Sequence, residues 1–137
     1  MRIAKKSYWQ LAVFTLLFVL VPIASMGMLG DLLPEIYATK ITLAYFFLAV
    51  FLLMLYMTCT GRAYWINGGP SYEETVAEPY RARAFLVRHL ISFGIATLVF
   101  LLYVGVAAIL KAAWYFDVSA FCILLIGAAI STVKVHF

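Results

Sequence analysis

The sequence predicts an all-α integral membrane protein in which four transmembrane helices form an up-down-up-down bundle. Of the 137 residues, 66% are hydrophobic and only 12% are charged, and the mean hydropathy is +1.04. A soluble domain usually has about 45–50% apolar and about 25% charged residues, so this composition cannot cover a water-exposed surface. The apolar residues also gather in four long uncharged runs. These observations exclude a soluble globular protein, a disordered chain and a disulfide scaffold.

Each apolar run is matched to the thickness of a bilayer. A spanning helix needs about 20 mostly apolar residues, because each residue rises about 1.5 Å through a hydrocarbon core about 30 Å thick. The first run could also be a signal peptide, but its length favours a retained span. The predicted spans are residues 9–29, 41–59, 90–110 and 118–133, in one domain of residues 1–137 with a connecting loop at 60–89. Drawn in this way, no span contains Asp, Glu, Lys, Arg or His.

Lysine and arginine are unevenly divided between the two sides of the predicted membrane. One side has eight of the ten basic residues: Arg2, Lys5, Lys6, Arg62, Arg81, Arg83, Arg88 and Lys134. The other side has Lys40 beside Asp31 and Glu35, and Lys111 beside Asp117. By the positive-inside rule, both termini and the second loop lie in the cytoplasm. We therefore expect a protein of a bacterial cytoplasmic membrane, whose net charge of +4 faces anionic headgroups rather than nucleic acid.

The second loop has strong structural signals and a weaker functional one. Asn67-Gly68-Gly69-Pro70 is typical of a tight turn, and Ser71 with Glu74 forms a capping box that starts a short helix at about residue 72. From residue 80 the chain runs without a breaker into the third span. The loop's candidate docking residues, for anionic lipid or for a partner subunit, are Trp65, Asn67, Arg81, Arg83 and Arg88.

Two further sets of residues lie inside the predicted spans. Tyr103 is the candidate intramembrane polar site, because a phenol in the membrane needs a hydrogen-bond partner. That partner is either a neighbouring helix or a ligand or lipid in a cavity. Small residues allow helices to approach closely, within one chain or between two. The candidate packing residues are Gly94, Gly105, Gly127 and Ser131.

The residues that usually carry catalysis do not form a constellation in this sequence. Cys59, Cys122, His89 and His136 lack metal-ligand spacing, so we expect no metal and no cofactor. The carboxylates predicted outside have no His or Cys on their own side of the membrane, so we expect no enzyme. Charge-free spans with small-residue faces favour a non-catalytic accessory or assembly subunit of a larger membrane complex, or a self-associating scaffold. The alternative is a homo-oligomeric small transporter, channel or lipid-flippase component without an intramembrane charged residue.

Overall fold

The computed structural model describes residues 5–137, and this part of the chain is helical without strands. Four long helices are each long and apolar enough to cross a membrane, as predicted. Arg2, one of the predicted cytoplasmic basic residues, lies outside the described part. The long helices are α1 (Trp9–Leu32), α2 (Glu35–Thr60), α4 (Pro79–Ile109) and α5 (Trp114–Val133). The shorter ones are η1 (Ala63–Trp65) and α3 (Tyr72–Ala77). The chain is therefore an integral membrane protein by the length and composition of its helices.

Each long helix extends past the predicted span at one or both ends. The extension is largest at the start of α4, which begins at Pro79 rather than at residue 90. Proline is well placed in the first turn of a helix, where its missing N–H has no partner to lose. The helix α2 begins directly after Pro34 and ends at Gly61, whose φ of +69° gives a left-handed cap with its N–H bonded to the Met57 carbonyl.

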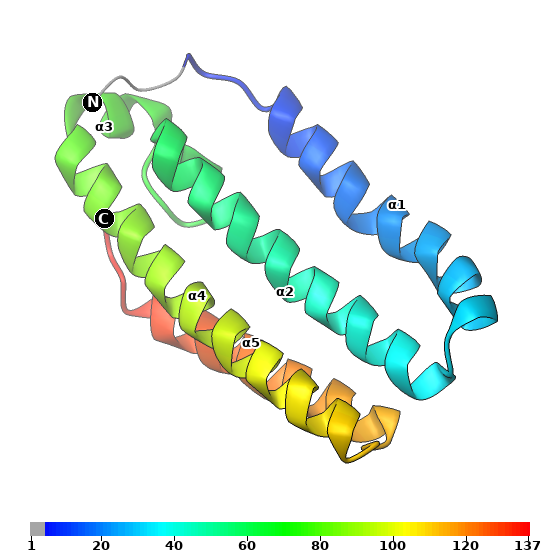
Figure 1. Cartoon of the computed structure of the whole chain (residues 1–137). Helices are drawn as coiled ribbons and strands as arrows, with labels where there is room; N and C mark the ends of the chain where they lie inside the picture. Colours follow the sequence, from blue (N-terminus) through cyan, green and yellow to red (C-terminus); the bar gives the residue numbers. More distant parts are fainter. Residues whose placement is uncertain (1–4) are drawn as a thin grey trace.

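The second long helix, α2, is the central element of the arrangement. It packs against α1, α4 and α5, and α4 also packs against α5, as Figure 1 shows. The main core lies among α2, α4 and α5, where Phe47, Phe100, Ala96 and Ala128 are buried. In contrast, Pro22 is the only buried residue of α1. The helices α2, α4 and α5 thus form a three-helix unit, and α1 lies along its outside.

The segment between α2 and α4 folds over one end of the three-helix unit. The Ser71 hydroxyl accepts a hydrogen bond from the Glu74 N–H, and the Glu74 carboxylate accepts one from the Ser71 N–H. Gly69 is tightly placed, because a Cβ there would lie 3.0 Å from the Ile66 carbonyl oxygen and 3.1 Å from the Phe85 ring. The last residues of the chain reach the same end, where the Phe137 ring contacts the Phe85 ring. We call this end the loop end, and we call the opposite end, with the α1–α2 and α4–α5 turns, the turn end.

Candidate functional site

A buried ion pair joins α2 to α5 at the turn end. The Lys40 Nζ lies 2.8 Å from the Asp117 Oδ2, and the two residues are 1% and 0% exposed. The sequence analysis placed both residues in loops, whereas the structure places both in helices. Lys40 lies inside α2 and Asp117 lies in the first turn of α5. Both helices begin before these charged residues, so they are longer than the charge-free runs from which the spans were predicted.

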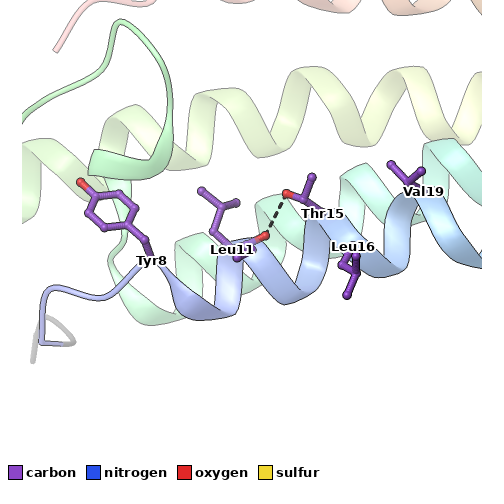
Figure 2. A pocket seen from close by; sticks show the side chains of 6 residues that line it. Tyr8, Leu11, Thr15, Leu16 and Val19 are labelled. Carbon is purple, nitrogen blue, oxygen red and sulfur yellow. Dashed lines mark hydrogen bonds between the residues drawn. The ribbon is translucent and has the colours of Figure 1, made fainter.

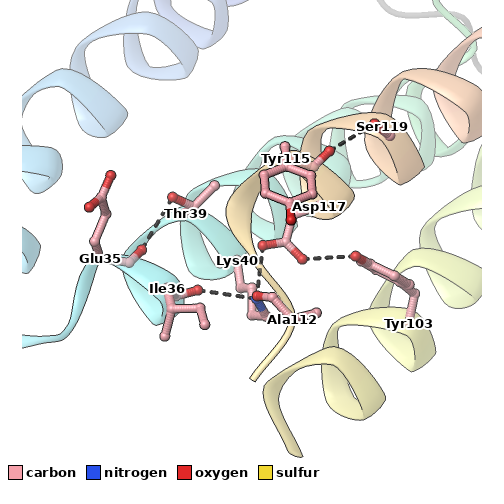
Figure 3. Close-up of polar contacts among 9 residues, drawn as sticks. All are labelled: Glu35, Ile36, Thr39, Lys40, Tyr103, Ala112, Tyr115, Asp117 and Ser119. Atoms are coloured by element: carbon pink, nitrogen blue, oxygen red, sulfur yellow. Dashed lines mark hydrogen bonds and ion pairs between the residues drawn. The ribbon is translucent and has the colours of Figure 1, made fainter. Parts of the chain in front are cut away.

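Every polar group of this ion pair has a partner from the same chain. Figure 3 shows the Lys40 ammonium among three oxygen atoms: besides Asp117, it donates to the Ala112 carbonyl at 2.7 Å and to the Ile36 carbonyl at 3.3 Å. An ammonium has three donors, so its hydrogen-bonding capacity is used completely. The second carboxylate oxygen, Asp117 Oδ1, accepts from the Tyr103 hydroxyl at 2.9 Å. The resulting polar network is defined by Lys40, Tyr103, Ala112 and Asp117.

The polar network connects all members of the three-helix unit. It takes the lysine from α2, the tyrosine from α4, the carboxylate from α5 and a carbonyl from the turn between α4 and α5. Charges that leave water are tolerated when they are paired and when their remaining donors and acceptors are satisfied. The network meets both conditions, so it fixes the three helices relative to one another.

Tyr103 therefore has the hydrogen-bond partner that its position required. The partner is a carboxylate on the neighbouring helix, 14 residues further along the chain. Tyr103 lies six residues before the end of α4 at Ile109, and so it is nearer the turn end than the middle of the helix. The sequence analysis identified Tyr103 as a candidate polar site, but it did not identify the Lys40–Asp117 ion pair to which the Tyr103 hydroxyl donates its hydrogen bond.

A second buried cation, which the sequence analysis did not single out, lies at the loop end. Arg62 is 5% exposed and follows α2 by one residue. Its guanidinium lies over the Trp65 ring at 4.7 Å and over the Tyr56 ring at 5.6 Å, and its Nη1 donates to the Gln10 Oε1. The Trp65 ring also stacks on the Tyr56 ring, and its Nε1 donates to the Ser7 carbonyl at 2.9 Å. Trp65, a candidate docking residue, is thus partly buried in intramolecular contacts.

The other candidate docking residues lie at the surface of the loop end. Asn67, Arg83 and Arg88 are exposed. Arg81 is exposed as well, and it pairs with Glu78 at 3.2 Å and donates to the Phe137 carbonyl at 2.8 Å. Arg81 and Trp65 have no contact partner in common, so these candidate residues do not form one site.

The candidate packing residues divide into one inside the fold and three on its outer surface. A Cβ on Gly94 would lie 3.2 Å from the Phe51 ring, so this glycine allows α4 to approach α2. A Cβ on Gly105 or Gly127 would meet nothing within 4 Å. Ser131 is exposed, and its hydroxyl donates to the Ala128 carbonyl of its own helix. Gly127 and Ser131 line an open groove of about 440 Å³ between α4 and α5, which we call the α4–α5 groove.

A hollow along α1 has few polar groups that could bind a ligand. It has a volume of about 600 Å³ and follows one face of α1 from Tyr8 to Val19 (Figure 2). The Thr15 hydroxyl in this hollow already donates to the Leu11 carbonyl at 2.9 Å. Within residues 5–137, no group of three or more His, Cys, Asp or Glu side chains could hold a metal ion. No family model, curated protein or solved structure matches this chain.

Proposed function

We propose that this chain is a non-catalytic membrane protein that serves as an accessory or assembly subunit of a larger membrane complex, or as a self-associating scaffold. The observation that supports this proposal is the closed polar network. Lys40 and Asp117 use their charges and hydrogen bonds on each other and on their own chain. An ionisable residue that serves a transport path needs to exchange partners. A pair that is fully satisfied and buried is suited instead to hold helices in place.

The proposal includes a membrane orientation. The helices α1, α2, α4 and α5 cross in an up-down-up-down order, with the loop end in the cytoplasm of a bacterial cytoplasmic membrane. Basic residues support this orientation. Those at the loop end include Lys5, Lys6, Arg62, Arg81, Arg83 and Arg88. At the turn end, the charge of Lys40 is neutralised by Asp117, which leaves Lys111 as the one unpaired basic residue there within 5–137. The exposed arginines then face anionic headgroups.

The surface proposed for the partner helix is the α4–α5 groove. Its lining is rich in small residues: Ser92, Ala96, Gly127, Ala128 and Ser131. In lipid, helices associate through close van der Waals packing, since lipid tails are as apolar as leucine side chains and the hydrophobic effect does not favour association. A groove with small residues on both walls admits another helix more closely than an ordinary helix face does.

Photocrosslinking in intact membranes tests this proposal. A photoreactive amino acid replaces Ile123, which is 70% exposed and lines the groove. The matched control replaces Ile23, which is 65% exposed on α1. We expect a discrete protein adduct from position 123 and lipid adducts alone from position 23. Two differently tagged copies of the chain show whether the adduct contains a second copy or another subunit. Lipid adducts alone at both positions, with a monomer in several mild detergents, would contradict the proposal.

A pair of glycine variants separates groove packing from general damage to the fold. Gly127→Leu fills the α4–α5 groove, whereas Gly105→Leu adds the same side chain on an exposed part of α4 outside the groove. We expect the first variant to abolish the adduct at position 123 and the second to leave it intact. Equal adduct yields from both variants would exclude the groove as the partner surface.

A further inference from the structure

Within the part of the chain that the structure describes, Arg62 is a buried cation that forms no ion pair. Its side chain is 95% enclosed by the protein, and its Nε has no hydrogen-bond partner within the described chain. The ion pairs among residues 5–137 involve other residues, and the guanidinium's hydrogen bond goes to the neutral amide of Gln10. A buried charge is costly unless an opposite charge compensates it, and stacking on aromatic rings supplies only part of the compensation.

The position of the guanidinium restricts which anion can reach it. Tyr56 and Trp65 lie against the guanidinium, and Nη1 is engaged by Gln10. Nε is covered by protein atoms, so Nη2 is the donor that remains for a phosphate oxygen, to which a guanidinium N–H donates a charge-assisted hydrogen bond. Arg62 lies between Gly61, the C-cap of α2, and η1, which contains Tyr64 and Trp65. Interfacial aromatic residues of this kind mark the headgroup level of a membrane, where phosphate diesters are abundant.

An apolar groove between α1 and α2 begins one helical turn below this cation. Gln10 is followed at i+4 by Phe14, and Tyr56 is preceded at i−4 by Leu52, so each contact of Arg62 shares a helix face with a residue of the groove. The groove has a volume of about 400 Å³, and it is lined by Phe14, Leu17, Phe18, Val21, Tyr45, Leu48, Ala49 and Leu52. Its one polar side chain, Tyr45, donates its hydroxyl to the Leu17 carbonyl at 3.1 Å. The groove therefore suits a hydrocarbon chain.

We propose that Arg62 binds the phosphate of an anionic glycerophospholipid and that an acyl chain of this lipid lies in the groove between α1 and α2. The groove is long enough to hold most of an acyl chain. From Phe14 to Val21 the helix rises about 10 Å, and the hydrocarbon of one leaflet is about 15 Å thick. The phosphate compensates the buried charge, and the acyl chain fills the space that the sparsely packed α1 leaves. The inference uses the proposed membrane crossing but not the partner at the α4–α5 groove, so the two proposals can fail separately.

Native mass spectrometry of the protein released from nanodiscs tests the lipid site. The nanodiscs contain phosphatidylcholine and phosphatidylglycerol in equal amounts, so that selective retention is measured as the ratio of the two lipid adducts. We expect the wild-type protein to retain one phosphatidylglycerol, and Arg62→Gln to lower that ratio by roughly tenfold or more through loss of the positive charge and of its charge-assisted hydrogen bond. The control is Lys134→Gln, which removes an exposed cation from the same end, outside the candidate docking residues, and leaves the ratio unchanged.

A second variant obstructs the groove without touching the cation. Leu52 lines the groove and is 53% exposed, so Leu52→Trp narrows the groove with little disturbance of the core. We expect it to lower phosphatidylglycerol retention although Arg62 is intact, with circular dichroism equal to that of the wild type. Retention of phosphatidylglycerol by Arg62→Gln at the wild-type ratio would overturn the proposal. Displacement of the lipid by inorganic phosphate at low millimolar concentration, with no effect of Leu52→Trp, would also overturn it in favour of a free-anion site.

Discussion

Removal of one charge from the polar network has a sharply defined expected outcome. Asp117→Asn keeps the size of the side chain and one oxygen acceptor, but it removes the negative charge that lies 2.8 Å from the Lys40 Nζ. Because Lys40 is 1% exposed and its other two partners are neutral carbonyls, the variant contains a buried ammonium without a counter-charge. Lys40→Met creates the opposite defect, a buried carboxylate whose one remaining bond comes from Tyr103.

The size of the effect follows from the burial of both partners. Removal of one member of a buried ion pair costs about 3–5 kcal/mol, because it leaves an uncompensated charge. At about 1.4 kcal/mol for each factor of ten, either single variant should lower the folding equilibrium constant by about two to three and a half powers of ten. The double variant Lys40→Met/Asp117→Asn has no buried charge, and neutral replacements of buried pairs are often tolerated. It should therefore be more stable than either single variant.

Unfolding by sodium dodecyl sulfate in mixed micelles, followed by far-ultraviolet circular dichroism, measures these free energies. The control variant is Glu35→Gln, which removes an exposed carboxylate from the first turn of α2 and should change stability little. The decisive quantity is the coupling free energy from the four proteins of the double-mutant cycle. If the losses of the two single variants add in the double variant, the two charges do not stabilise each other and the account of the polar network is wrong.

Three smaller perturbations test other parts of the structure. Tyr103→Phe removes the hydrogen bond to Asp117 but no charge, so it should lower the free energy of unfolding by about 1 kcal/mol. The same micelle titration measures this loss, and a loss as large as that of Asp117→Asn would contradict the expectation. Gly69→Ala places a methyl group 3.0 Å from a carbonyl oxygen and 3.1 Å from an aromatic ring of α4, so it should lower the free energy of unfolding by about 1–3 kcal/mol. A thermal melt measures this destabilisation, and an unchanged melting temperature would contradict it. With the native cysteines replaced by serine, Asn67→Cys should react with a membrane-impermeant maleimide only after permeabilisation, whereas Asp31→Cys should react in intact cells, and the reverse pattern would invert the proposed orientation.

The helices could be predicted from the sequence because each depends on signals close together in the chain. An apolar run of about 20 residues determines a spanning helix, and the Ser71–Glu74 capping box acts over three residues. The ion pair has no such local signal, since its partners are 77 residues apart. The second predicted span was started at residue 41, directly after Lys40, and the fourth at residue 118, directly after Asp117. The rule that excludes charges from spans therefore ended the predicted segments just short of the two residues that join α2 to α5.

The loop end shows a different reason for incomplete prediction. Trp65 and Arg62 were assigned to a polar loop, where tryptophan and arginine usually serve as exposed anchors. In the structure they pack on each other and on Tyr56, because the chain turns back at Gly61 and places η1 against the end of α2. The sequence does place an arginine close to aromatic residues, since Arg62 lies six residues after Tyr56 and three before Trp65. Whether the aromatic rings stack on the guanidinium depends on the direction in which the chain turns at Gly61, and the residues alone do not determine that direction.

The two buried cations together indicate which end of the molecule is complete and which end requires another molecule. Lys40 has three oxygen partners, one of them a carboxylate, all supplied by its own chain. Arg62 is buried almost as deeply, but within the described residues it has one neutral amide and two aromatic rings. Since the two cations have the same charge and similar burial, the difference lies in their partners. The polar network at the turn end is stabilised within the chain, whereas Arg62 at the loop end has no carboxylate partner within the described residues, and we propose that an anionic lipid supplies the missing charge.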